Sequence, residues 1–331
     1  MKKRFLVLTT LGLCAAVAQA RGMAAALEDA SQSSASSDLA SRIEASPSLP
    51  FHGEHFAAQA PRAGWESGSV SSVAIGADGL IYELQRGDKS DPVVVLDARG
   101  KVLRSWGKGN YKIPHTIRLD PSGNVWTVDA SLSTIIKYSR RGKKLMTIKV
   151  GEQPQTNSPF DGTTDIAFAP NGHLFITDGY GNARVLEYSP NGKRLRQWGQ
   201  SGEGRGEFHL PHAIQIAKNG TIFVADRENG RIEKFDLNGN YLGQIAGLGR
   251  VYSLKVVGDV LWATMQRLDQ PTGSAGWIVK MDRDSGKILG HLTVAETSGL
   301  HSIEVSSSGE PIITLGNQLL WFRRNEARAG N

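Results

Sequence analysis

Short runs of alternating apolar and polar residues follow one another along most of the chain, separated by polar turns. A run such as 116–119 (TIRL) leads through a turn ending in glycine to a second run such as 124–128 (NVWTV). A third run, as at 135–138 (IIKY), and a fourth, as at 195–198 (LRQW), complete the pattern. Alternation with a period of two is typical of half-buried strands, so each unit is predicted to contain four short antiparallel strands.

This unit recurs six times beyond residue 65. The third unit starts 49 residues after the second, and the fourth starts 48 residues after the third. Four antiparallel strands repeated at this spacing form a propeller blade, so the predicted fold class is all-β, a six-bladed β-propeller over residues 51–331. The first halves of the six units are 71–84, 115–128, 164–177, 212–225, 252–264 and 301–314.

The sixth unit is incomplete, because only three clear strands precede the end of the chain. An open blade would expose a strand edge, which proteins generally cover. Residues 50–65 are the remaining material, and we predict that they supply or cover the outer strand of the sixth blade.

The N-terminal segment has the pattern of an export signal. Residues 2–4 are basic, residues 5–17 are apolar and residues 18–20 (AQA) form a small-residue cleavage site, so 1–20 is predicted to be a signal peptide. Residues 21–50 are rich in alanine and serine and are predicted to be a flexible lead-in. We therefore expect an exported protein, periplasmic or secreted, without a membrane span.

The composition narrows the range of partners. The chain has 38 basic and 32 acidic residues; without Lys2, Lys3 and Arg4 of the signal peptide, 35 basic residues face 32 acidic ones. This balance gives no basis for a nucleic-acid partner. Cys14 is the only cysteine and lies in the signal peptide, so disulfides and thiolate metal sites are excluded after cleavage. We expect a monomer.

Histidine alternates with other residues at the first position of the innermost strand. Since alternate blades of a six-bladed ring lie a third of a turn apart, the three imidazoles can converge on the axis, which is how a catalytic zinc is bound. Iron, copper and nickel also accept imidazole ligands. The alternative is three ordinary channel-lining residues, although three histidines in alternate positions rarely arise by chance. In blade order, the residues at this position are Ser71, His115, Thr164, His212, Tyr252 and His301.

The loops after the second strand of each unit are expected to place further polar side chains at the same end of the blades as the histidines. Arg86, Tyr180 and Arg227 lie in these loops. Guanidinium groups suit a carboxylate, and a phenol beside a metal ion and guanidinium groups is expected to have a lowered pKa and to act as a base. Taken singly, each arginine could form a surface ion pair, and Tyr180 could pack against its neighbours.

Two segments, 176–179 (ITDG) and 223–232 (FVADRENGRI), resemble the NHL repeat family, and the resemblance extends over about residues 68–325. The recurring Asp178 and Asp226 are expected to be structural, because aspartate at a strand end accepts backbone N–H bonds in the following turn.

Four segments look like the peptidyl-α-hydroxyglycine α-amidating lyases. They are 113–117 (IPHTI), 178–184 (DGYGNAR), 210–214 (LPHAI) and 225–231 (ADRENGR). The resemblance implies zinc bound by histidines of three blades, a tyrosine base and arginine partners for the substrate's carboxylate. In this sequence the zinc ligands would be His115, His212 and His301, the base Tyr180, and the carboxylate partners Arg86 and Arg227.

The implied reaction breaks the C–N bond of a peptidyl-α-hydroxyglycine to give an amide and glyoxylate. The substrate would be a small molecule or peptide with a terminal carboxylate, hydroxylated by another protein. The alternative function is a non-catalytic NHL propeller that binds a peptide or cell-wall ligand. A lactonase is disfavoured, because that chemistry needs carboxylate and asparagine ligands around calcium.

Three positions depart from this family. Gly181 stands where vertebrate members have cysteine, Leu300 replaces a proline, and Ser302 replaces an aspartate that helps to hold a structural calcium. A calcium site is therefore not expected, and the sixth blade is the least similar part.

Overall fold

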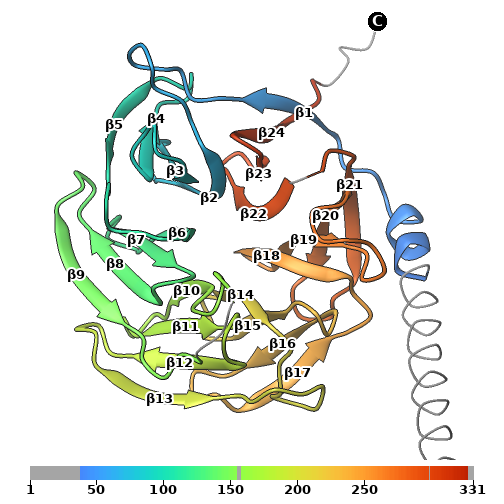
Figure 1. Ribbon diagram of the computed structural model, residues 1–331. Coiled ribbons are helices and arrows are strands. Elements are labelled where there is room, and N and C mark those ends of the chain that lie inside the picture. The colour runs from blue at the N-terminus through green and yellow to red at the C-terminus, as the bar shows by residue number, and fades with distance from the viewer. Residues whose placement is uncertain (1–37, 155–157, 298, 327–331) are drawn as a thin grey trace, which may run out of the picture.

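The computed structural model describes residues 38–154, 158–297 and 299–326. The described chain forms six four-stranded antiparallel sheets around a central axis, which confirms the predicted all-β, six-bladed propeller (Figure 1). Within this part of the chain, no helix is long and apolar enough to cross a membrane.

Each of the first five blades consists of four consecutive strands, the first of which lies nearest the axis. Blade one contains β2 (Ser69–Ile75), β3 (Ile81–Arg86), β4 (Val93–Leu96) and β5 (Val102–Trp106). Blade two contains β6 (Pro114–Leu119), β7 (Val125–Asp129), β8 (Thr134–Tyr138) and β9 (Lys144–Lys149). Blade three contains β10 (Asp165–Phe168), β11 (Leu174–Asp178), β12 (Arg184–Tyr188) and β13 (Arg194–Trp198). Blade four contains β14 (Pro211–Ile216), β15 (Ile222–Asp226), β16 (Arg231–Phe235) and β17 (Tyr241–Ile245). Blade five contains β18 (Arg250–Val257), β19 (Val260–Gln266), β20 (Gly276–Asp282) and β21 (Ile288–Val294).

The sixth blade joins the two ends of the propeller. It contains β22 (Gly299–Val305), β23 (Pro311–Leu315), β24 (Gln318–Arg324) and, outermost, β1 (Phe51–Phe56). β1 pairs with β24 along its whole length (Figure 1). The ring of Phe56 packs edge-on against Trp321, with centroids 5.5 Å apart. The prediction that residues 50–65 complete the last blade is thus confirmed.

The segment before β1 differs from the predicted flexible lead-in over residues 21–50. Residues 38–44 are helical and bury Leu39 and Ile43 against the apolar core of blade five. The backbone of Leu49 then donates a hydrogen bond to the carbonyl of His291 in β21. The prediction is wrong for residues 38–50, because the i, i+4 spacing of Leu39 and Ile43 creates one apolar face. Residues 1–37, including the predicted signal peptide, lie outside the described part.

The innermost strands carry a β-bulge where the sequence placed its alternating histidines. The pairing register shifts between Pro114 and Thr116 in β6 and between Pro211 and Ala213 in β14. A bulge leaves one residue unpaired and turns its side chain. In these two strands the unpaired residue is the histidine, and its side chain is directed toward the axis.

Candidate metal centre

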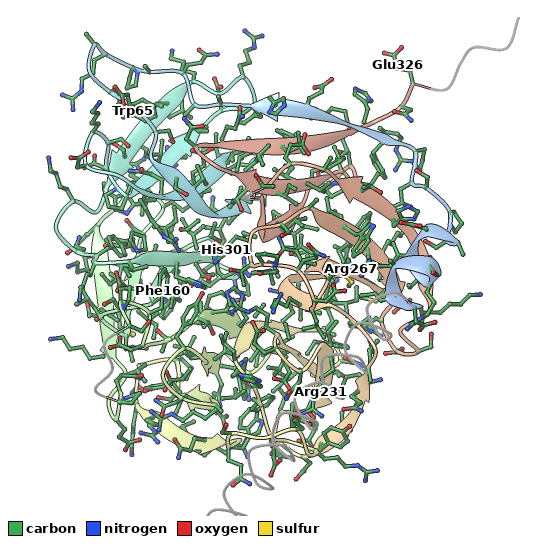
Figure 2. The ribbon with its side chains drawn as sticks, turned by 45° about the vertical axis from the view of Figure 1, so that its right-hand side comes forward. Trp65, Phe160, Arg231, Arg267, His301 and Glu326 are labelled. Carbon is green, nitrogen blue, oxygen red and sulfur yellow. The ribbon has the colours of Figure 1, made fainter. Side chains whose placement is uncertain are left out.

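Three histidines from alternate blades converge on the axis of the propeller. They are His115 in β6, His212 in β14 and His301 in β22, and one nitrogen of each lies within 4.8 Å of the others. The Nε2 atoms of His115 and His301 are 3.1 Å apart. His115 and His212 are almost completely buried, and His301 lies in the middle of the ring (Figure 2).

The backbone of the neighbouring blades sets the tautomer of each ring. The Nδ1 atoms lie within hydrogen-bonding distance of carbonyl oxygens at the corresponding position of the next blade around the ring. Since a carbonyl oxygen only accepts, Nδ1 carries the proton and Nε2 keeps a lone pair directed at the axis. The contacts are His115 with Thr164 O at 2.7 Å, His212 with Tyr252 O at 2.6 Å, and His301 with Ser71 O at 2.7 Å.

Electrostatics keep the three imidazoles neutral. Burial lowers the pKa of His301 to about 3, and burial followed by nearby positive groups lowers the pKa of His115 and His212 well below the usual value. A neutral imidazole is the form that binds a metal ion. The protein therefore presents three ligands that need no deprotonation at neutral pH.

The three histidines could bind a metal ion, and one pair of their nitrogens has the spacing of zinc ligands. Tetrahedral zinc with Zn–N bonds of 2.0–2.1 Å requires its ligand nitrogens to be about 3.3 Å apart, close to the separation of His115 and His301. Three nitrogen ligands leave a fourth position for a substrate oxygen. Within the described residues, no other group of three or more histidine, cysteine or acidic side chains brings its ligand atoms together in this way.

Tyr180 reaches the same point from the loop after β11. Its hydroxyl lies 3.0 Å from Nε2 of His115 and 3.1 Å from Nε2 of His212. Glycines flank it because the loop presses against other backbone: a Cβ on Gly179 would lie 2.2 Å from the carbonyl oxygen of Pro211, and one on Gly181 would lie 2.1 Å from that of Asp161. Side chains at either position would push the loop, and Tyr180 with it, off the axis.

The pKa of Tyr180 differs from the prediction. Burial raises it above the usual phenol value, and this outweighs the opposite effect of the positive charges of Arg227 and Arg86. The predicted lowering is therefore wrong for the protein chain alone, since desolvation of a phenolate costs more than the two guanidinium groups return.

The structure also brings the two predicted arginines to the histidine end of the channel. The Nε of Arg86 donates to the carbonyl of Pro114 at 2.9 Å, while its Nη2 is buried without a hydrogen-bond partner. Arg227 is held by Glu228, whose Oε1 accepts from its Nε at 2.8 Å. Arg227 and Tyr180 line a cavity of about 440 Å³ together with Ser158, Phe160, Leu210 and Thr272.

Two aromatic residues of this site were not predicted to have a role. Phe160 packs against Tyr180 with ring centroids 5.1 Å apart and lies under the guanidinium of Arg86. Tyr252 contacts the ring of His212 and the guanidinium of Arg227. Phe160 lies in the loop between β9 and β10, four residues before Thr164, at the position that Phe208 occupies before His212. Tyr252 occupies the position equivalent to the histidines. That position in the sequence could have identified it as a residue of the site.

The recurring aspartates are structural, as predicted, although their partners differ. Asp178 and Asp226 are fully buried and accept hydrogen bonds from Arg184 and Arg231 at the start of the next strand, each at 2.8 Å. These ion pairs tie the second and third strands of the blade together. The donors to these two aspartates are thus mainly side chains, and not the backbone N–H groups of the following turn that were expected.

The structure explains the two positions in blade six at which the sequence differs from the amidating lyases. Leu300 has a φ of 69°, a left-handed conformation that proline, fixed near −65°, cannot adopt. Ser302 is buried, and its hydroxyl lies 3.1 Å from that of Ser72. This position therefore offers a hydroxyl that is already hydrogen-bonded in place of a carboxylate.

The fold and the histidines define a six-bladed β-propeller with a candidate metal centre on its axis. A family model with the description "DUF5128: 6-bladed beta-propeller" matches residues 155–307. Solved structures of the same fold include a streptogramin B lyase, with a TM-score of 0.56, 14% identity and coverage of 82% of this chain and 97% of that one. A gluconolactonase-like protein has a TM-score of 0.57 and 14% identity, covering 82% and 98%. These similarities concern the fold alone.

Similarity in sequence leads to the amidating lyases. The chain is 35% identical over 179 residues to peptidyl-alpha-hydroxyglycine alpha-amidating lyase 1 of Drosophila melanogaster, covering 50% of this chain and 32% of that protein. Lyase 2 of the same organism is 31% identical over 250 residues, covering 70% and 59%. Mouse peptidyl-glycine alpha-amidating monooxygenase is 32% identical over 200 residues, covering 51% and 20%. The chain thus spans between a fifth and three fifths of these relatives, and its resemblance to the amidating lyases is confirmed.

Proposed function

We propose that this protein is a zinc-dependent carbon–nitrogen lyase that cleaves peptidyl-α-hydroxyglycine-like substrates to an amide and glyoxylate. The observation that carries the proposal is the position of Tyr180, whose hydroxyl lies within hydrogen-bonding distance of Nε2 of both His115 and His212. A base beside three histidines that would hold a metal ion, with arginines next to it, suits the removal of a proton from the substrate's hydroxyl. The lyase names of the relatives support the same reaction.

Substrate binding would use the cavity above the histidines. The unpaired Nη2 of Arg86 has a free donor, and Arg227 is oriented by Glu228. Guanidinium groups bind carboxylates through charge-assisted hydrogen bonds, so these two residues would hold the substrate's terminal carboxylate. The Phe160 ring packs between Tyr180 and Arg86 and would help to exclude water from the reacting end.

The proton transfers follow from this arrangement. Tyr180, as phenolate, takes the proton of the α-hydroxyl; the oxygen forms a carbonyl with the α-carbon, the C–N bond breaks, and its electron pair stays on the amide nitrogen. That nitrogen receives a proton, which Tyr180 can return, so no water is consumed. When bound to the three histidines, Zn²⁺ would act as a Lewis acid toward the substrate oxygen. Burial raises the pKa of Tyr180, and the positive charges of Arg227 and Arg86 act in the opposite direction, toward the phenolate form that the base needs.

Export is part of the proposal. The signal-like residues 1–20 would be removed to leave Arg21 as the first residue of a monomeric periplasmic or secreted protein. N-terminal sequencing of protein collected outside the cytoplasm tests this step. An intact Met1 would contradict it, and a lipid on Cys14 would indicate an anchored form.

The reaction is tested with the full chain supplied with zinc and a short N-acyl α-hydroxyglycine. Release of amide and glyoxylate in equal amounts, above the rate without protein, is the expected result. Absence of turnover across several acyl groups by protein that carries zinc would reject the lyase and favour the alternative, a propeller that binds a peptide or cell-wall ligand.

A further inference from the structure

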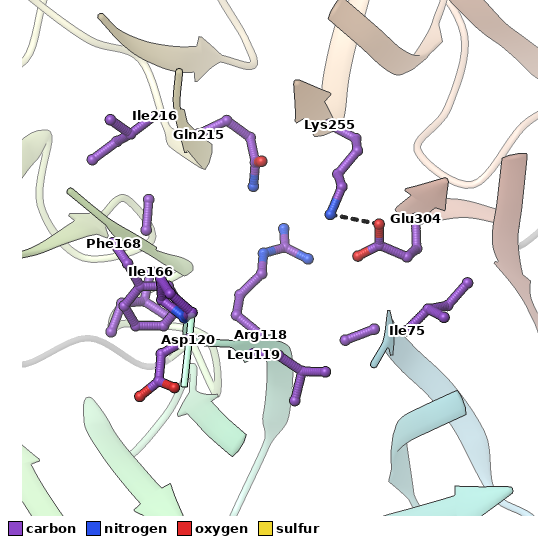
Figure 3. Close-up of a pocket in the computed structure, with 13 residues that line it drawn as sticks. Ile75, Arg118, Leu119, Asp120, Ile166, Phe168, Gln215, Ile216, Lys255 and Glu304 are labelled. Carbon is purple, nitrogen blue, oxygen red and sulfur yellow. Dashed lines mark ion pairs between the residues drawn. The ribbon is translucent and has the colours of Figure 1, made fainter. Parts of the chain in front are cut away.

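A second ring of residues lines the channel at the end opposite to Tyr180. It consists of the residues three positions after each histidine-equivalent position, about 10 Å further along the innermost strands. Because the preceding β-bulge adds one residue, these side chains also face the axis. They surround a cavity of about 260 Å³ (Figure 3). The ring is Ala74, Arg118, Ala167, Gln215, Lys255 and Glu304.

Arg118 is the central residue of this cavity. Its side chain is nine-tenths buried, and its Nη2 donates to Oδ2 of Asp165 at 2.8 Å. Its Nε is buried without any hydrogen-bond partner. The guanidinium extends between Gln215 and Lys255 (Figure 3). A buried, charged donor without an acceptor is costly, and such a group in a native protein calls for a partner.

The three acidic groups nearby are already engaged. Asp120, which also lines the cavity, accepts from Nε1 of Trp126 at 3.0 Å and pairs with Lys137 at 3.4 Å. Asp165 accepts hydrogen bonds from the backbone N–H groups of Ile166 and Ile214 in addition to Arg118. Glu304 pairs with Lys255 at 2.5 Å, drawn as a dashed line in Figure 3. The guanidinium of Arg118 and the amide of Gln215 therefore remain as donors that line the cavity, while the alanines of the ring leave room beside them.

We propose that this cavity binds a small oxyanion, with the oxygens held by Arg118 and Gln215 and with Lys255 nearby. The chemistry suits a carboxylate of a few atoms, since the cavity is too small for a peptide and since guanidinium and amide groups both donate hydrogen bonds to carboxylate oxygens. The site lies outside the proposed catalytic residues and does not depend on the proposed reaction.

The test is isothermal titration calorimetry of the full chain with sodium acetate and, separately, with sodium sulfate, which distinguishes a carboxylate from a tetrahedral oxyanion. Saturable binding of one salt to one site per chain is expected. Gln215→Leu should weaken it by about 10- to 100-fold, the usual effect of losing one hydrogen bond to a charged group. Arg118→Met combined with Asp165→Asn should abolish it without leaving a buried charge unpaired.

The controls separate this site from the histidine end. Binding should persist in His212→Ala and in Arg227→Gln, which alter the candidate metal centre and the carboxylate partner there. The proposal is overturned if neither salt binds, or if binding is lost in these two variants and kept in Gln215→Leu. Thermal unfolding of Gln215→Leu, which removes no charge, confirms that the comparison is made between folded proteins.

Discussion

The hydroxyl of Tyr180 lies 3.1 Å from Nε2 of His212, although the two residues belong to neighbouring blades. The loop of blade three thus extends over the candidate ligand of blade four. The same hydroxyl is 3.0 Å from His115 of blade two, so one side chain contacts two members of the trio. This position makes Tyr180 the residue whose removal best separates chemistry from metal binding.

Tyr180→Phe should retain zinc and lose activity. The substitution keeps the ring packed against Phe160 and removes only the oxygen. General bases usually contribute about 10²–10⁴-fold, so kcat should fall by that factor while the zinc content stays unchanged. Steady-state kinetics and metal analysis of the same samples check both. Full activity would exclude Tyr180 as the base and leave the lyase reaction possible.

His212→Ala should lose most of the bound metal. Wild-type protein purified without chelators or a histidine tag should contain about one zinc-like ion per chain, because three neutral nitrogens converge on one point. His55→Ala is the matched control, since His55 is exposed on β1, the outermost strand of blade six, whereas His301 lies on the innermost strand of that blade. A wild-type stoichiometry near zero after metal repletion would contradict the metal centre.

Arg227→Gln should act mainly on substrate binding. The guanidinium is held by Glu228 beside the Tyr180 cavity and is proposed to bind the substrate's carboxylate. Loss of one charge-assisted hydrogen bond corresponds to about 10- to 100-fold in KM. Substrates whose carboxylate is replaced by an amide should show a smaller effect. An equal loss for both substrates would indicate a structural role for Arg227. Arg86→Gln is expected to behave in the same way.

Glu83 makes stability depend on pH. Both carboxylate oxygens are buried without partners, and burial raises the pKa to about 8 from an ordinary value of 4.5. Between these values the folded protein holds a proton that the unfolded chain has released, so stability falls as pH rises. Glu83→Gln should remove this dependence, with a difference between pH 5 and pH 8 on the order of 3 kcal/mol in the free energy of unfolding.

Urea denaturation at the two pH values measures this difference. Glu54→Gln is the control, because Glu54 is exposed on β1 and should leave the pH dependence as in the wild type. Equal slopes for wild type and Glu83→Gln would show that Glu83 ionises normally in the folded protein.

The repeat made the fold and the histidine trio predictable. Four short strands with a period of two identify a blade. Residues at the same position in successive blades lie at the same height around the axis, so His115, His212 and His301 could be placed together without a structure. The same argument brought Tyr180, Arg86 and Arg227 to one end of the channel. Symmetry carries this information, because it relates residues far apart in sequence.

The sequence did not predict several features of the site and the fold that do not follow from the repeat. The pKa of Tyr180 depends on burial, which follows from how tightly the loop is closed by its flanking glycines. Phe160 contacts Tyr180 of blade three and Arg86 of blade one, and Leu39 packs on blade five, far away in sequence. Arg118 stands in a strand as an ordinary polar residue, and only the bulge before it explains why it faces the axis. These features arise from contacts between segments that share no pattern.

The pairing of β1 with β24 means that strands from both ends of the described chain must be in place before the sixth blade is complete. β1 emerges from the ribosome before every other strand of the ring, whereas β22, with His301, belongs to the group that emerges last. The third imidazole joins the other two only when the last blade inserts between blades five and one. An ion bound by the three histidines would bind only the closed ring. It would therefore stabilise the closed ring against opening. For an exported chain, the compartment in which the ring closes would decide which metal is incorporated.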